Sequence, residues 1–147
     1  MRAVLVIALI LCGCASVPNP RLEPGLLRFT PAPRVAADEH ASRLPYGLRF
    51  VVSDTGSMEP HLTAGDYLVA DFSFEYDDLK PYDVVLYDPV WNTNNSRLVC
   101  HFTYERRGTS WVMLSTGPRF NFETGSIMLS LEHYRAKVIA VYRLQHP

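Results

Sequence analysis

Seven short runs rich in Val, Ile, Tyr, Phe and Trp, each bounded by turn-forming residues, constrain the fold of this 147-residue chain most strongly. They cover residues 47–53, 66–72, 83–88, 97–104, 110–115, 127–131 and 136–143. No window of twelve or more residues keeps a helical period, so we expect at most one short helix or helical turn, near residues 73–79. The pattern predicts a mainly β fold of about seven strands with little helix, formed by one compact domain of residues 46–147.

The N-terminal residues have the character of an export signal. Arg2 supplies a positive charge, and residues 3–11 form an apolar run that is too short to span a bilayer but suits the core of a signal peptide. The run ends at Gly13-Cys14 and resembles the bacterial lipobox. That resemblance implies that residues 1–13 are a lipoprotein signal peptide and that Cys14 is lipidated. A plain secretory signal and an uncleaved anchor are the alternatives.

If Cys14 is lipidated, the protein is exported and anchored by lipid to the bacterial cell envelope, at its periplasmic face. Ala15, in place of an aspartate after the lipidated cysteine, implies sorting to the outer membrane if the source is Gram-negative. Residues 14–45 contain six of the 11 prolines and show no sustained period, so we interpret them as a Pro-rich tether between the anchor and the domain. Residues 26–29 could instead pack on the domain as a strap.

Charge and cysteine content exclude several classes of function. The chain has 14 basic and 15 acidic residues and no long run of either sign, so we expect no nucleic-acid partner. Removal of residues 1–13 and lipidation of Cys14 leave Cys100 as the only thiol, which excludes an intrachain disulfide. The five histidines have no metal-ligand spacing, so we expect no metal and no cofactor.

The most specific motif is Ser-Asp-Thr-Gly-Ser-Met-Glu-Pro-His-Leu at residues 53–62, followed by Ala-Gly-Asp-Tyr-Leu-Val at residues 64–69. Gly56 permits a tight turn beside Ser57, and Pro60 stiffens the exit from that turn. The stretch resembles the nucleophile box of the signal peptidase I family of serine proteases, which runs Gly-Ser-Met-x-Pro-x-Leu and then Gly-Asp. The resemblance covers about residues 47–143 and implies a coiled β-sheet domain in which Ser57 is the nucleophile.

The same resemblance points to the base that would activate this serine. In histidine-type members the base follows a Gly-Asp-Ile-Val-Val segment, within a Val-His-Arg context. Residues 82–87 match that segment, and His101 then falls at the base position. Two residues depart from the family pattern: Tyr82 replaces the usual glycine, and Phe102 replaces the arginine that follows the base. A histidine with an ordinary pKa of about 6.5 would place the acid limb of the pH–rate profile at about pH 6–7.

Three further roles stay open. Lys80 is the competing base, because other members of the family use lysine. Glu123 or Asn121 could accept a hydrogen bond from the imidazole and fix its tautomer. For the oxyanion hole, the Ser57 backbone N–H is one donor and Thr55 is the candidate second. Cys100 is not expected to pair with His101, because adjacent strand residues point to opposite faces.

These features predict a membrane-anchored serine endopeptidase that cleaves exported or precursor proteins by acyl transfer through a Ser57–His101 dyad. An extended polypeptide substrate would bind as an added strand. A self-cleaving domain of the repressor type is one alternative, although the chain has no DNA-binding segment. The other alternative is a non-catalytic β-domain lipoprotein with a binding or structural role in the envelope.

Overall fold

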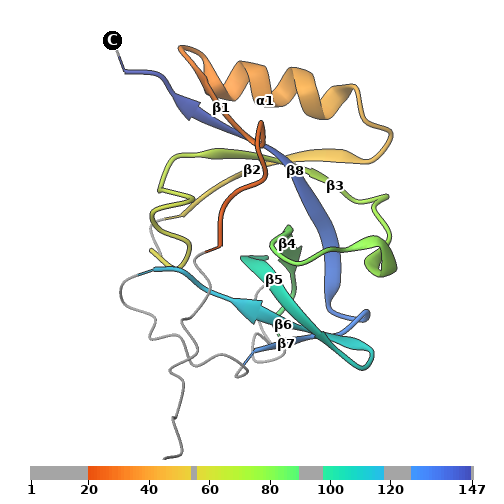
Figure 1. Ribbon diagram of the computed structural model, residues 1–147. Helices are drawn as coiled ribbons and strands as arrows, with labels where there is room; N and C mark the ends of the chain where they lie inside the picture. Colours follow the sequence, from red (N-terminus) through yellow and green to blue (C-terminus); the bar gives the residue numbers. More distant parts are fainter. Residues whose placement is uncertain (1–19, 54–55, 90–97, 118–126, 147) are drawn as a thin grey trace, which may run out of the picture.

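The computed structural model describes residues 20–53, 56–89, 98–117 and 127–146, which form a mainly β fold with one short α-helix (Figure 1). The elements are β1 (Leu27–Thr30), α1 (Pro33–Ser42), β2 (Gly47–Val51), β3 (Tyr67–Asp71), a 3-10 turn (Tyr76–Asp78), β4 (Val84–Tyr87), β5 (Val99–Arg107), β6 (Ser110–Leu114), β7 (Met128–Leu129) and β8 (Tyr134–Leu144). Each of the seven predicted runs overlaps one strand, and β5 and β8 extend beyond their runs, so the prediction of a mainly β fold is confirmed. The predicted helical turn near residues 73–79 is the 3-10 turn.

Eight strands of the described chain form one sheet in the order β2-β3-β8-β4-β5-β6-β7, with β1 paired to β8. The β1–β8 pair is parallel, and the other pairs are antiparallel. β8 is the longest strand of the described chain and pairs with β1, β3 and β4, so it joins the two halves of the sheet (Figure 1). β2 and β3 therefore lie on one side of β8, while β4 to β7 lie on the other.

Two hydrophobic clusters cover opposite faces of the central strands. All four residues of β4 are buried, and successive residues enter different clusters because side chains alternate along a strand. The first cluster consists of Leu26, Met58, Leu62, Leu68, Ala70, Val84, Leu86, Phe102, Leu114, Ala136, Val138 and Val141. The second cluster consists of Tyr76, Leu79, Val85, Tyr87, Trp111, Met113, Leu129 and Tyr134. Residues of one strand can thus belong to different chemical environments.

The second half of the predicted tether is part of the folded domain. β1 confirms the alternative of a strap, because it pairs with β8 from Leu27 to Thr30. α1 was not predicted, although Pro33 occupies its first turn, a position where the fixed φ of proline favours a helix. The face that α1 buries consists of Ala37 and Ala41, which are too small to give a strong apolar period.

α1 covers a third, smaller cluster formed by Ala37, Ala41, Val69, Ala140 and Tyr142 (Figure 1). Polar contacts hold the helix in place. His40 Nδ1 lies 3.0 Å from the Tyr142 hydroxyl, and Asp38 forms an ion pair with Arg49 of β2 at 2.5 Å. The N-terminal strap and helix therefore extend the domain beyond the boundary at residue 46 that the sequence predicted.

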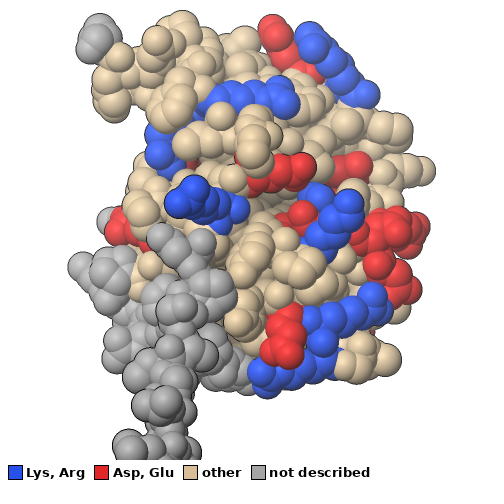
Figure 2. Space-filling view, in the orientation of Figure 1, with Lys and Arg blue, Asp and Glu red and all other residues tan. Residues whose placement is uncertain are grey.

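The surface carries both charges. Figure 2 shows Lys and Arg side chains interspersed with Asp and Glu over the face that it presents. Within the described ranges, no helix has the length and apolar character needed to cross a membrane. The predicted signal segment and Cys14 lie outside those ranges.

Candidate active site

The turn that carries Ser57 connects β2 to β3 and is fixed on both sides of the serine. Gly56 has a φ of 64°, in the left-handed region that glycine adopts without strain. Met58 and Leu62 are buried in the first cluster, with exposed fractions of 3% and 1%. Because these side chains anchor the turn, Ser57 itself stays at its partly exposed surface.

The backbone carbonyl of Ser57 is held by the segment that follows β6. It accepts hydrogen bonds from the Thr116 N–H at 2.8 Å, the Gly117 N–H at 2.9 Å and the Ser115 hydroxyl at 2.5 Å. A Cβ atom at position 117 would lie 1.7 Å from the Gly56 carbonyl oxygen, so a side chain there would displace the turn. The close approach of the two segments thus requires glycine at position 117.

A buried ion pair holds the far end of the same turn. Asp66 is 2% exposed, and both of its carboxylate oxygens accept hydrogen bonds from Arg143 of β8, at 2.8 and 2.7 Å. Arg143 also donates to the carbonyl of His61 at 3.0 Å. The guanidinium therefore ties the Ser57 turn to the central strand of the sheet.

His101 lies in β5 and is 6% exposed. Its Nδ1 atom is 2.7 Å from the hydroxyl of Tyr87, on the neighbouring strand β4. Burial lowers the pKa of His101 to about 4, below the ordinary value that the sequence-based pH range assumed. Burial also raises the pKa of Tyr87, so the phenol stays neutral. The imidazole is consequently neutral at neutral pH, the state that a general base requires.

The segment 115–117 connects the Ser57 turn with the strand that carries His101. The last pair of the β5–β6 ladder is Phe102 with Leu114, and one further antiparallel step would place Ser115 across from His101. The Ser115 hydroxyl holds the Ser57 carbonyl. The turn and the beginning of β5 therefore belong to the same end of the sheet.

The two faces of β5 separate His101 in part from the turn that carries Ser57. Phe102 packs in the first cluster together with Met58 and Leu62 of the turn, and the ring of His61 lies edge-on to it at 5.4 Å between centroids. His101 alternates to the other face, where Tyr87 belongs to the second cluster. The apolar side chains of the turn thus pack on the face of β5 opposite to His101.

The surroundings of Cys100 and of Lys80 do not suit the role of general base to Ser57. Cys100 is a half-buried free thiol that packs against the first cluster, and burial raises its pKa to about 12. The expectation that Cys100 and His101 point to opposite faces is confirmed. Lys80 is exposed, and its backbone N–H donates to the Asp83 carboxylate at 2.8 Å.

Four predicted site residues lie outside the described residues, namely Cys14, Thr55, Asn121 and Glu123. Their roles stay predictions. Among the residues that the structure describes, no group of three His, Cys, Asp or Glu side chains could hold a metal ion.

Two residues next to the candidate site were missed by the sequence analysis, Tyr87 and Ser115. Both lie within predicted strands, and the sequence analysis gave neither a role in the site. The signal that could have identified Tyr87 is the register of β4 and β5, because the pair Val85 and His101 places Tyr87 two residues further along the same face.

Comparisons with protein-family models, with curated proteins and with solved structures found no match to this chain.

Proposed function

We propose that this chain is a lipid-anchored serine endopeptidase that resembles signal peptidase I and acts through Ser57. One observation carries the proposal: the Ser57 carbonyl accepts three hydrogen bonds from the segment 115–117, at the end of the sheet where β5 begins. A nucleophile that is fixed through its main chain does not need the substrate to position it. The coiled β-sheet fold of that family belongs to the same proposal, which the mainly β sheet of the described residues supports.

In the proposed reaction, the Ser57 hydroxyl attacks the scissile carbonyl carbon, and its proton passes to Nε2 of His101. For Nε2 to accept this proton, Nδ1 must carry the other ring hydrogen and donate it to the Tyr87 oxygen. Tyr87 then performs the orienting role predicted for Glu123 or Asn121. The oxyanion accepts hydrogen bonds from the Ser57 N–H and from Thr55.

The tetrahedral intermediate then collapses, and His101 donates its proton to the leaving amine. An acyl-enzyme remains on Ser57, and a water molecule activated by His101 hydrolyses it. The substrate is an extended polypeptide that binds as an added strand, from an exported or precursor protein. A lipid on Cys14 would keep the enzyme at the envelope surface, where such proteins pass.

The proposal is tested by incubating the full chain with a diverse peptide library and identifying cleaved bonds by mass spectrometry. Ser57→Ala should reduce cleavage about 10⁴-fold, as in triad enzymes that lose the nucleophile. Ser53→Ala is the matched control, because this exposed serine lies in the same loop, and it should leave cleavage unchanged. Equal cleavage by wild type and Ser57→Ala would refute the assignment.

The second candidate is a non-catalytic β-domain lipoprotein with a binding role. The burial of His101 favours it, since a histidine that is 6% exposed and bonded to a buried tyrosine also suits a purely structural role. In that case the wild type would cleave no peptide of the library. His101→Ala would then reduce stability without changing any activity.

A further inference from the structure

A pocket of about 470 Å³ lies between the loop that follows β3 and the turn that precedes β8. This volume is within the range of ligand pockets. Its walls include Tyr46, Phe74, Tyr76, Leu131 and Tyr134, and none of the residues of the Ser57 turn lines it. The pocket is therefore separate from the candidate active site.

Two large apolar side chains of this pocket are exposed to solvent. Tyr46 is 67% exposed and Leu131 is 65% exposed, the two highest values among the exposed large hydrophobic residues of the described chain. Both line the pocket although they come from distant segments, the approach to β2 and the turn before β8. A ligand that contacted both would remove a substantial apolar area from water.

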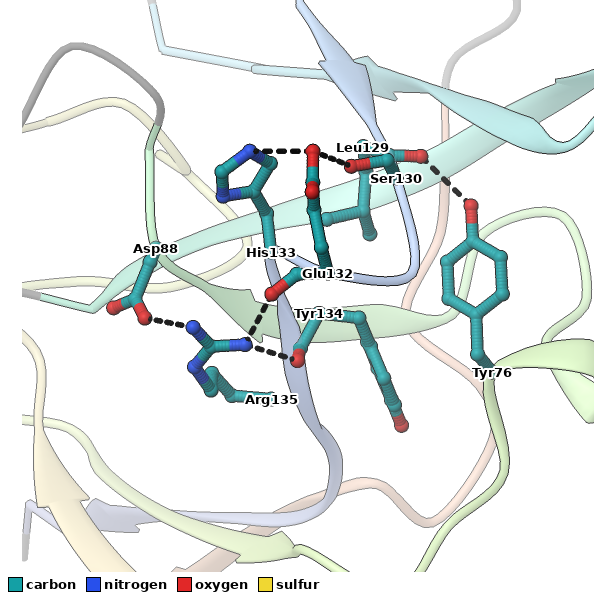
Figure 3. A network of polar contacts seen from close by, with 8 residues as sticks. All are labelled: Tyr76, Asp88, Leu129, Ser130, Glu132, His133, Tyr134 and Arg135. Atoms are coloured by element: carbon teal, nitrogen blue, oxygen red, sulfur yellow. Dashed lines mark hydrogen bonds and ion pairs between the residues drawn. The ribbon is translucent and has the colours of Figure 1, made fainter.

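The deeper rings offer apolar surface rather than hydrogen-bonding groups. The Tyr76 hydroxyl donates to the carbonyl of Leu129 at 2.7 Å, and the Tyr134 hydroxyl donates to the carbonyl of Phe74 at 2.9 Å. Figure 3 shows the first of these bonds, with the rings of Tyr76 and Tyr134 on one side of the network. A ligand would therefore meet these tyrosines mainly through their rings.

The pocket is not a cage for a small organic cation. The Lys137 ammonium already lies 4.5 Å from the ring centroid of Phe74, and the Arg106 guanidinium lies 6.0 Å from that of Tyr76. The protein's own cations thus occupy ring positions that a quaternary ammonium ligand would need.

Charges of both signs surround the pocket, but each cation has a carboxylate partner: Arg106 pairs with Asp77, Arg135 with Asp88 and Lys137 with Asp83. The charges that lack such a partner within the described chain are negative. The Glu75 carboxylate, which lines it, forms no hydrogen bond or ion pair within the described chain. Within the same residues, the Asp71 carboxylate bonds only to Ser73. Arg135 also lines the pocket, but its charge is compensated by Asp88 at 2.5 Å, on the side away from the two rings (Figure 3). Burial raises the pKa of Tyr134, and the charges of Asp71, Asp83 and Glu75 raise it further.

We propose that this pocket binds a basic segment of another polypeptide, with an apolar side chain of that segment between Tyr46 and Leu131 and a Lys or Arg side chain facing Glu75. A polypeptide suits the pocket better than a small cation because it carries both side chains on one backbone. The separation from Ser57 means that binding does not depend on peptidase activity.

The experiment uses the full chain with Ser57→Ala, which prevents cleavage of the probe. The probe is the blocked peptide acetyl-Ala-Phe-Lys-Arg-Ala-amide, and the control peptide replaces Lys and Arg by Glu. Isothermal titration calorimetry should show the basic peptide binding at least about tenfold more tightly than the acidic one, because only the acidic peptide places like charges near Glu75.

Substitutions in the pocket should distinguish the contribution of its apolar side chains from that of its negative charge. Leu131→Ser should weaken binding of the basic peptide about tenfold, as loss of an apolar anchor does. Glu75→Gln should weaken it about threefold, as expected for an exposed ion pair. Val35→Ser is the matched control, because Val35 is 56% exposed on α1 and does not line the pocket.

Three results would overturn the proposal. They are equal affinity for the two peptides, the absence of saturable binding of the basic peptide up to about 1 mM, and identical affinity in the Ser57→Ala chain and in the same chain with Leu131→Ser added. Because binding is measured directly, loss of peptidase activity in any variant does not affect the result.

Discussion

The turn that carries Ser57 and the strand that carries His101 are fixed in different ways. Backbone donors of Thr116 and Gly117 hold the turn, whereas His101 is held by burial and by one side chain, Tyr87. Changes around the turn should therefore alter the position of the candidate nucleophile. Changes around His101 should instead alter its protonation.

Removal of Arg143 should have the largest effect on stability. Arg143→Ala leaves the carboxylate of Asp66 buried without a counter-charge, which should cost about 3–5 kcal/mol of unfolding free energy. Urea unfolding measures this cost. Arg106→Ala is the control, because its ion pair with Asp77 is exposed and should contribute at most about 1 kcal/mol.

A second substitution tests whether the unpaired charge of Asp66 causes this loss of stability. The double variant Arg143→Ala with Asp66→Asn removes the unpaired charge, so it should recover part of the lost stability. Equal costs for the Arg143 and Arg106 variants would show that the turn does not depend on its link to β8.

Acid should destabilise the fold through His101, with an effect of intermediate size. The folded pKa of about 4 lies below the ordinary histidine value of 6.5, so the unfolded chain binds the proton more tightly between these values. Stability should therefore fall as the pH decreases from 6.5 to 4, by roughly 3 kcal/mol in total. Urea unfolding of wild type and of His101→Gln, which cannot titrate, should diverge over that range. Parallel curves would contradict the burial of a neutral His101.

Loss of the Tyr87 hydroxyl should have the smallest effect on stability. Tyr87→Phe leaves Nδ1 of His101 without its partner and should cost about 1–3 kcal/mol. It should also lower kcat of the proposed peptidase, because the tautomer of His101 is no longer fixed. Tyr134→Phe removes a hydroxyl from the same cluster and should leave kcat unchanged. A Tyr87→Phe variant with normal kcat would limit Tyr87 to packing.

The strands were predictable because their residues alternate between two buried faces, as in β8. α1 was not, since its buried face contains only Ala37 and Ala41, and the prolines before it suggested an extended tether. In the candidate site, the motif identified Ser57 and His101, but the contact with Tyr87 depends on the register of β4 and β5. That register follows from the packing of the whole sheet and not from local sequence.

The central claim, that Ser57 acts with a neutral buried His101, is tested most directly by the pH dependence of kcat/KM for a peptide that the wild type cleaves. Protonation of the base removes activity, so the acid limb should have its midpoint near pH 4, the pKa that burial gives His101. His101→Ala should be inactive across the range. An acid limb of this profile near pH 6.5 that persists in His101→Ala would contradict the account. An acid limb near pH 7–8 together with inactivity of Lys80→Ala would also contradict it.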